Sequence, residues 1–422
     1  MKKLLLLFIS LFSFCGNIYP QSFNDLYTLY KHKEYFRLRD LSVSTRQLNT
    51  DWQKIYFSSL VKSLFCDFKG ANNDINKLTD EYFAYIPDSL ITELYKIKII
   101  NHANLFEYKD AFDCSNIINS KYKKYLSKEE GEDFESDVTL WKAIIDAPSQ
   151  ETIKPGAQKI KMKRDIAGLW NLPVNAGNTL YNFIFDTGAN FSVMVESAAR
   201  KSGLKIIDAK IKVGTSTNIK VESKVAVADS IKIGDIIIKN VVFLILPDEA
   251  LSFGWYKING IIGNPVLRSF EEITINDSLE MIIPDTPSTR PFSNLTFEEF
   301  TPVIQMVQDK DTINMIFDSG GDKSMLYFAY YKINEKTIKD KYKMIKIKIG
   351  GAGGSLTLNG YILKNIILGT GNNSAELNEI RLLAEYTKEK NEFFYGVIGQ
   401  DYISSFKEVT INFKNMFIDF RN

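Results

Sequence analysis

Two short stretches of this chain share one pattern: an apolar run that ends in aspartate, followed by a hydroxyl residue and a glycine. "IFDTGAN" begins at Ile184 and "IFDSGGD" begins at Ile316. A single Asp-Thr-Gly or Asp-Ser-Gly is ordinary turn chemistry. Two copies supply two carboxylates, Asp186 and Asp318, and two carboxylates about 3 Å apart cannot both ionise easily. Such a pair shares one proton and can act as base and acid in the same reaction.

The rare residues exclude other common catalysts from most of the chain. Both histidines, His32 and His102, and all three cysteines, Cys15, Cys66 and Cys114, occur no later than position 114. Ser-His and Cys-His catalysts, and metal sites built on His or Cys, are therefore excluded beyond that point. We expect no metal and no cofactor there. Cys66 and Cys114 are either one disulfide or two buried thiols, and the sequence leaves both open.

Length and charge limit the classes of partner. A chain of 422 residues predicts two or three domains. The 52 Lys+Arg and 51 Asp+Glu nearly cancel, so no overall field attracts nucleic acid or an anionic membrane. Two lysines, an apolar run over Leu4–Phe14 and a polar exit predict a signal peptide over 1–21, hence an exported, periplasmic or secreted protein. A lipoprotein attached at Cys15 is the alternative, although Phe14 fits such a signal badly. No segment is long enough to span a membrane.

Residues 22–147 have helical periodicity, with apolar residues every three or four positions and few Gly or Pro. Three stretches resemble one another around Tyr35, Ala71 and Ala111. Their spacing suits stacked helical hairpins and resembles a short tetratricopeptide-like array. That resemblance implies a possible protein partner at this region; the alternative is a plain helical packing domain.

The remainder is rich in β-branched residues and glycine, and it contains a duplication. "NFIFDTG" at 182–188 matches "NMIFDSG" at 314–320, "GIIGNPVLRSFEEITIN" at 260–276 matches "GVIGQDYISSFKEVTIN" at 396–412, and a "KN" pair at 239–240 matches another at 364–365. A proline cluster separates the halves. We therefore expect one β-rich lobe over 159–284, a linker over 285–301, and a second lobe over 302–422. Because each half carries its own apolar strands, we expect the pair to fold without residues 22–146.

The paired motifs resemble the aspartic proteases of the pepsin and retropepsin group. Each lobe of that family carries Asp-Thr/Ser-Gly and, later, two apolar residues followed by Gly. The "DTGAN" and "GIIGNPVL" phrases look closer to retropepsins, whereas two lobes in one chain is the pepsin arrangement. The resemblance implies an N-terminal all-α helical array followed by an all-β bilobal protease fold.

The resemblance also implies roles for individual residues. Asp186 and Asp318 would be the catalytic pair, and the substrate would be an extended polypeptide. Thr187 and Ser319 would hydrogen-bond across a pseudo-twofold axis. The remaining expected positions are the glycines beside the dyad, the apolar-Gly motifs and the tips of two hairpin flaps, in that order: Gly188 and Gly320; Ile262, Gly263, Ile398 and Gly399; Gly214, Thr215, Gly351 and Gly353.

One departure from the family pattern keeps alternatives open. The residue after Asp-x-Gly is usually Ser, Thr or Ala, but the second lobe has Gly321 followed by Asp322. The leading hypothesis is an exported aspartic endopeptidase. The alternatives are a non-cleaving peptide-binding protein on the same fold and a scaffold whose helical region is its main function.

Overall fold

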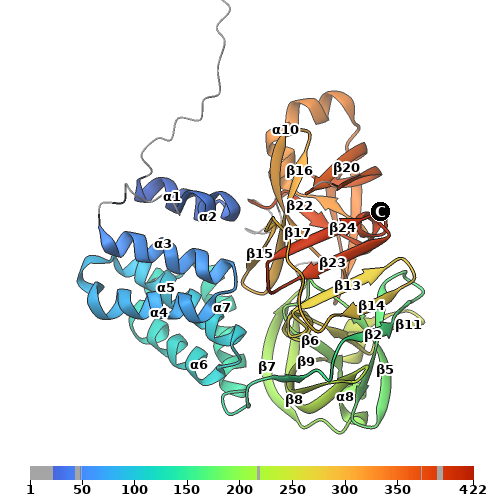
Figure 1. Cartoon of the computed structure of the whole chain (residues 1–422), viewed down its shortest axis with the longest axis horizontal. Coiled ribbons are helices and arrows are strands. Elements are labelled where there is room, and N and C mark those ends of the chain that lie inside the picture. Colours follow the sequence, from blue (N-terminus) through green and yellow to red (C-terminus); the bar gives the residue numbers. More distant parts are fainter. Residues whose placement is uncertain (1–21, 43–47, 49, 216–218, 372, 387–392) are drawn as a thin grey trace, which may run out of the picture.

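The helical region opens the part of the chain that the structure describes. The computed structural model describes residues 22–42, 48, 50–215, 219–371, 373–386 and 393–422. The predicted signal peptide, including Cys15, lies outside these residues. Helices pair as antiparallel neighbours and stack side by side, at the left of Figure 1. Their bounds are α1 (Phe23–Lys31), α2 (Tyr35–Ser42), α3 (Asp51–Leu64), α4 (Phe68–Glu81), α5 (Asp88–Asn104), α6 (Tyr108–Ile117) and α7 (Lys128–Ala143).

The turns inside the helix pairs use residues in the left-handed conformation. Lys33, Cys66 and Phe106 have φ of 61°, 67° and 61° in the α1–α2, α3–α4 and α5–α6 turns. A non-glycine residue there costs roughly 1–2 kcal/mol, which packing of the flanking helices must offset. The repeated positions around Tyr35, Ala71 and Ala111 are fully buried in the second helix of each pair. In the described chain Cys66 is a half-buried and Cys114 a buried free thiol, so the two cysteines do not form the disulfide that the sequence left open.

The first lobe is built on one mixed sheet in the order β1-β9-β6-β12-β5-β4-β8-β7, with β3 on β4. Strand β1 lies before residue 159, where the first lobe was expected to begin. Its three residues nevertheless pair with β9 and belong to this sheet. The lobe therefore begins before residue 159. The bounds are β1 (Glu151–Ile153), β3 (Lys163–Arg164), β4 (Trp170–Ala176), β5 (Thr179–Phe185), β6 (Ser192–Val195), α8 (Glu196–Lys201), β7 (Ile206–Gly214), β8 (Lys220–Ile233), β9 (Ile236–Leu246), β10 (Ser252–Phe253), β11 (Tyr256–Lys257), β12 (Gly260–Ile262) and α9 (Asn264–Arg268).

The second lobe repeats this plan in the order β15-β16-β17-β22-β18-β21-β20-β19. Strand β15 falls inside the stretch 285–301 that was predicted to be a linker. It forms a hairpin with β16 and is therefore part of the second lobe. Only the proline-containing part of that stretch is a connection. The bounds are β15 (Leu295–Glu298), β16 (Thr301–Gln308), β17 (Asp311–Phe317), β18 (Met325–Leu326), α10 (Phe328–Lys341), β19 (Ile345–Gly351), β20 (Gly354–Thr370), β21 (Asn373–Leu383), β22 (Gly396–Ile398) and α12 (Gln400–Ile403).

A third sheet joins the lobes and lies between them in Figure 1. Its order is β2-β14-β13-β23-β24, with β2 (Gln158–Lys161), β14 (Glu280–Ile283), β13 (Glu272–Asn276), β23 (Glu408–Asn412) and β24 (Phe417–Arg421). Thr274 pairs with Thr410, its own counterpart in the duplicated phrase, and their hydroxyl oxygens are 2.9 Å apart. A residue that faces its own repeat marks a twofold axis. The predicted fold class, a helical array followed by two β lobes, is therefore confirmed.

The array packs directly on both lobes. Helix α7 lies against β7 of the first lobe, and α3 lies against β15 of the second. Arg268 lies over the rings of Phe68 in the array and Phe297 in β15, at 5.0 and 4.9 Å. Both rings are buried. The expectation that the lobes fold without residues 22–146 therefore conflicts with this shared core, which their removal would open to water.

Candidate active site

Two aspartates lie at the ends of equivalent strands, on either side of the twofold axis. Asp186 follows β5 and Asp318 follows β17. Strands β12 and β22, which carry the apolar-Gly motifs, run parallel to β5 and β17. The backbone N–H of Asp186 donates to the carbonyl of Ile262 at 3.1 Å, and that of Asp318 donates to Ile398 at 3.0 Å. The apolar-Gly strands thus fix where each aspartate leaves its sheet.

Reciprocal hydrogen bonds connect the two loops. The N–H of Thr187 donates to Oγ of Ser319 and the N–H of Ser319 donates to Oγ1 of Thr187, both at 3.0 Å. Each hydroxyl in turn donates to a carbonyl of the other lobe, Thr187 to Phe317 and Ser319 to Phe185, again at 3.0 Å. Both hydroxyl residues are fully buried. Neither lobe can move its loop without breaking bonds to the other.

The carboxylates lie against the opposite loop. The N–H groups of Gly188 and Ala189 donate to Oδ1 of Asp186 at 2.8 and 3.1 Å, and that of Gly320 donates to Oδ1 of Asp318 at 2.9 Å. A Cβ built on Gly188 would lie 2.6 Å from Cγ of Asp318, and one on Gly320 would overlap the carboxylate of Asp186. Only glycine leaves room for two carboxylates this close.

The surroundings of the pair favour the protonated form of each carboxyl group. Burial raises the pKa of Asp186 well above its ordinary value, and the charge of Asp318 and a hydrogen bond between the two carboxyl groups raise it further. Burial also raises the pKa of Asp318, against the hydrogen bond with Asp186 and the N–H groups of Gly320 and Gly321. The two groups titrate as one pair. A protonated and an ionised carboxyl group side by side can supply an acid and a base together.

Two buried side-chain amides that the sequence motifs did not identify bind the backbone of the two loops. Nδ2 of Asn264 donates to the carbonyl of Thr187 at 2.5 Å, and Nε2 of Gln400 donates to that of Ser319 at 2.7 Å. Each amide directly follows its apolar-Gly motif in the duplicated phrase. An amide kept at the same place in both halves was the signal that could have identified them.

Two serines complete this symmetric support. Ser192 and Ser324 accept hydrogen bonds from the N–H groups of Gly263 and Gly399 at 3.2 and 3.0 Å. Each serine comes six positions after its aspartate, so this repeat too is readable in the sequence. A Cβ on Gly263 or Gly399 would lie 2.6 or 2.7 Å from backbone atoms of the loop in front. These glycines let the strand pass behind the loop.

The predicted flap tips lie on hairpins that meet across the lobes. Gly214 pairs with Lys220 at the end of β7–β8; residues 216–218 lie outside the described chain. Gly351 pairs with Gly354 at the end of β19–β20. Gly353, with φ of 80°, donates its N–H to the carbonyl of Ala250 in the first lobe at 3.1 Å. A Cβ there would lie 2.8 Å from the side chain of Val221. Thr215, beside Gly214, donates to the carbonyl of Ile219 at 2.9 Å.

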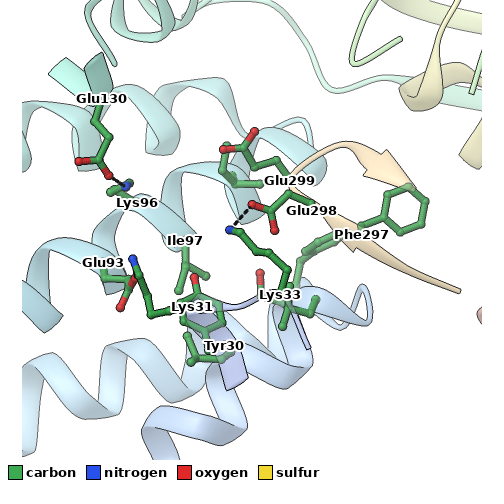
Figure 2. Close-up of a pocket in the computed structure, with 15 residues that line it drawn as sticks. Tyr30, Lys31, Lys33, Glu93, Lys96, Ile97, Glu130, Phe297, Glu298 and Glu299 are labelled. Atoms are coloured by element: carbon green, nitrogen blue, oxygen red, sulfur yellow. Dashed lines mark hydrogen bonds and ion pairs between the residues drawn. The ribbon is translucent and has the colours of Figure 1, made fainter. Parts of the chain in front are cut away.

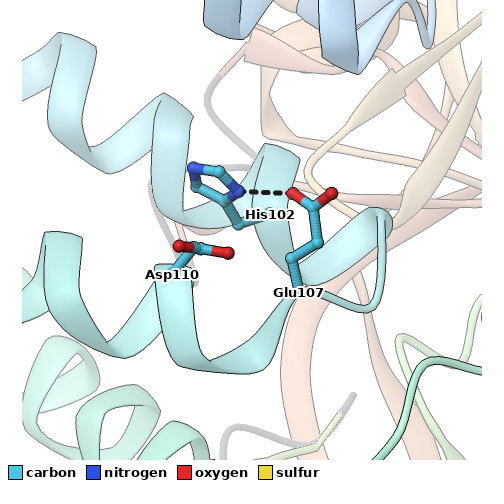
Figure 3. A group of neighbouring side chains, drawn as sticks. All are labelled: His102, Glu107 and Asp110. Atoms are coloured by element: carbon cyan, nitrogen blue, oxygen red, sulfur yellow. Dashed lines mark hydrogen bonds and ion pairs between the residues drawn. The ribbon is translucent and has the colours of Figure 1, made fainter.

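Two further sets of polar side chains are candidates for a site: Asp322 and a cluster in the helical array. Asp322, two residues after Gly320, is exposed. In the array, ligand atoms of His102, Glu107 and Asp110 lie within 4.8 Å of one another (Figure 3), and Nδ1 of His102 contacts Glu107 at 2.7 Å. Imidazole and carboxylate are donors that Zn²⁺ accepts. The contact also links the end of α5 to the start of α6, which gives these side chains a structural role.

The structure places two β-rich lobes around a twofold axis, and each lobe contributes one Asp-Thr/Ser-Gly loop to the pair. A family described as aspartyl protease matches residues 172–266, the stretch that carries Asp186 and the first apolar-Gly motif. Among solved structures, the chain is similar to a retropepsin-like aspartic protease from Rickettsia conorii, with 20% identity, 32% of this chain and 91% of that chain covered, and a TM-score of 0.21. No curated protein matches this chain. The family match confirms the resemblance predicted from the motifs.

Proposed function

We propose that this protein is an aspartic endopeptidase whose catalytic pair is Asp186 and Asp318. The ionised carboxylate of the pair takes a proton from a water molecule, whose oxygen attacks the carbonyl carbon of a peptide bond. The protonated partner stabilises the carbonyl oxygen and then supplies a proton to the leaving nitrogen. The observation that carries the proposal is the pair of loops, cross-linked by Thr187 and Ser319, that holds both carboxylates against each other.

The other predicted residues receive supporting roles. Gly188 and Gly320 let the carboxylates approach and donate N–H groups to them. The hairpins that end near Gly214 and Gly353 would cover an extended polypeptide substrate, whose backbone can approach glycine closely. The chemistry requires no cofactor.

The setting of the enzyme is part of the proposal. We expect export through the segment 1–21, into the periplasm or medium, and no nucleic acid partner. None of the helices in the described ranges is long and apolar enough to cross a membrane. The helical array offers a surface for a protein partner.

The decisive experiment uses the full chain and an unfolded protein substrate over a range of pH. Asp186→Asn and Asp318→Asn should each remove nearly all cleavage, because shared-proton acid–base catalysis contributes at least ~10²–10⁴-fold. Asp322→Asn is the matched control and should cleave like the wild type, since that carboxylate is exposed. Half of the wild-type rate in either dyad variant would refute the mechanism. Binding of a statine-type inhibitor without any cleavage by the wild type would instead identify a peptide-binding protein on the same fold.

A further inference from the structure

The turn between β15 and β16 lies between the helical array and the first catalytic loop. Glu298 pairs with Thr301, so Glu299 and Phe300 form the turn itself. Glu299 has φ of 58°, a conformation that favours Gly or Asn in such turns. Figure 2 shows Glu298 and Glu299 beside Lys33 and the array helices, at a cavity of about 220 Å³.

The array contacts this turn at the carboxylate of Glu298. Nζ of Lys33 lies 2.6 Å from Oε1 of Glu298, with side chains only 18% and 12% exposed. The hydroxyl of the fully buried Tyr35 donates to Oε2 of the same carboxylate. Because both oxygens are engaged and water is largely excluded, removal of this carboxylate leaves a partly buried cation and a buried hydroxyl without their partner.

The other side of the turn holds the loop that follows Asp186. Nδ2 of Asn264 donates to the carbonyl of Phe300 at 2.6 Å, and the same amide group donates to the carbonyl of Thr187 at 2.5 Å. The hydroxyl of Thr301 donates to Oδ1 of Asn190 at 3.1 Å. Short polar contacts therefore run from the array, through Glu298 and the turn, to the first loop.

Aromatic packing reinforces the same connection. The ring of Phe300 lies 5.2 Å from that of Phe191, just after the Asp186 motif, and Phe191 lies 6.1 Å from Trp141 of α7. Trp141 and Phe300 are buried, with 1% and 5% exposure. The array thus contacts the first catalytic loop by packing as well as through the turn.

The second loop is held differently. The carbonyl of Ser319 accepts its bond from Gln400, whose own Oε1 accepts from Arg164 in β3 at 2.7 Å. This amide support comes from within the two lobes. The array reaches the second lobe's strand β17 before the loop, where Nδ2 of Asn314 donates to the carbonyl of Lys33 at 3.0 Å. Because Asn264 bonds both the turn and the Thr187 loop itself, loss of the Glu298 contact should affect the Thr187 loop more than the Ser319 loop, and this asymmetry provides an internal control.

We infer that the helical array is a positioning part of the active site, and that Glu298 is the residue through which it orients the Asp186 loop. This inference rests on the proposed function and assigns the array a role beyond partner binding. If the Thr187 loop relaxes, the N–H groups of Gly188 and Ala189 align less well with Asp186. Weaker donors disfavour the ionised form, so the first apparent pKa of the pair should rise.

The test compares Glu298→Ala with Arg39→Met in the full chain. Arg39 donates to the carbonyl and hydroxyl of Ser293 at 3.1 and 3.2 Å, so it joins the array to the segment before β15 without contacting the turn. We expect Glu298→Ala to lower kcat roughly tenfold or more with KM little changed, since small misplacement of a catalytic group is costly. The acid limb of its kcat profile should move toward neutral pH. Arg39→Met should do neither.

A second measurement does not depend on activity. In the Asp186→Asn background, amide exchange is compared at two matched N–H groups outside the reciprocal cross-link. That of Asn264 donates to the carbonyl of Ala189 in the first loop, and that of Gln400 donates to the carbonyl of Gly321 in the second loop, both at 2.9 Å. Exchange at Asn264 should be faster with Glu298→Ala, while exchange at Gln400 stays unchanged. If Glu298→Ala fails to fold, Tyr35→Phe removes one bond to the same carboxylate and is measured in the same two ways. Unchanged kcat and pH profile, equal effects of both variants, or equal exchange at the two loops would overturn the inference. An inactive wild-type protein would refute the proposed function, and the exchange result would still decide the coupling.

Discussion

Replacing Thr187 by Val tests how strongly the loop cross-link contributes to the fold and the site. Valine keeps the shape of threonine, but it removes the acceptor for the Ser319 N–H and the donor to the Phe317 carbonyl. Both orphaned groups are in buried surroundings, and each unsatisfied buried group costs ~1–3 kcal/mol. The free energy of unfolding should therefore fall by about 2–6 kcal/mol.

The matched control is Thr296→Val, another fully buried threonine, whose hydroxyl donates to the carbonyl of Leu64 at 2.7 Å. It orphans one carbonyl and should cost ~1–3 kcal/mol. Urea titration measures both stabilities, and kcat/KM is measured where both proteins are folded. We expect kcat/KM to fall ~10²-fold in Thr187→Val only, since the loop carries Asp186. Equal stability losses, or an unchanged kcat/KM in Thr187→Val, would contradict the proposed role of the cross-link.

Three further changes have defined outcomes. Gly320→Ala places a methyl group on the carboxylate of Asp186 and should abolish cleavage. Gly131→Ala is the control and should leave kcat unchanged, because a Cβ there meets nothing within 4 Å. An active Gly320→Ala protein would contradict the close approach of Gly320 to Asp186. Ala189→Ser adds a hydrogen-bond donor near a carboxyl pair whose pKa is raised, and this donor stabilises the ionised form. The kcat/KM profile of the wild type is expected to peak at roughly pH 5–7 and should shift toward acid in this variant. No shift, or a wild-type optimum below about pH 3.5, would count against this reasoning. Lys220 lies on the first hairpin, 2.8 Å from Asp133 and 3.7 Å from Glu132 of α7. Lys220→Glu should raise KM through repulsion from both carboxylates, and the added changes Asp133→Lys and Glu132→Lys should restore it. An unrestored KM would show that these ion pairs do not position the hairpin.

The sequence predicts the paired loops well because their chemistry is local. Aspartate, a hydroxyl and glycine must follow one another for the N–H groups to reach the carboxylate, and this need is met twice. The two "KN" pairs, in contrast, were wrongly matched as equivalent positions of the two halves. Asn240 lies in β9, after the turn at Gly234, whereas Asn365 lies in β20, before the turn at Gly371, so the two are not equivalent. Asn240 and Asn365 have φ of 57° and 55°, so both lie in the left-handed conformation, which asparagine adopts more readily than most residues.

Long-range contacts account for most of what the sequence does not reveal. The array turns at Lys33, Cys66 and Phe106 contain no glycine, so their left-handed residues give no signal in the composition. Strand β15 follows a proline cluster and looks like linker until its pairing with β16 is known. The contact of Lys33 with Glu298 joins residues 265 positions apart, which no periodicity encodes.

The pairing of Thr274 with Thr410 also has a consequence for stoichiometry. A symmetric homodimer of single lobes presents every outer surface twice, so anything that recognises one catalytic loop must recognise both. Fusion into one chain removes that obligation. Here β15 receives the helical array, whereas the first lobe meets it through α7 and Arg268. Each carboxylate pair is therefore accompanied by one helical array, because both are parts of the same chain. A mutation can also change the outer surface of one lobe without changing that of the other.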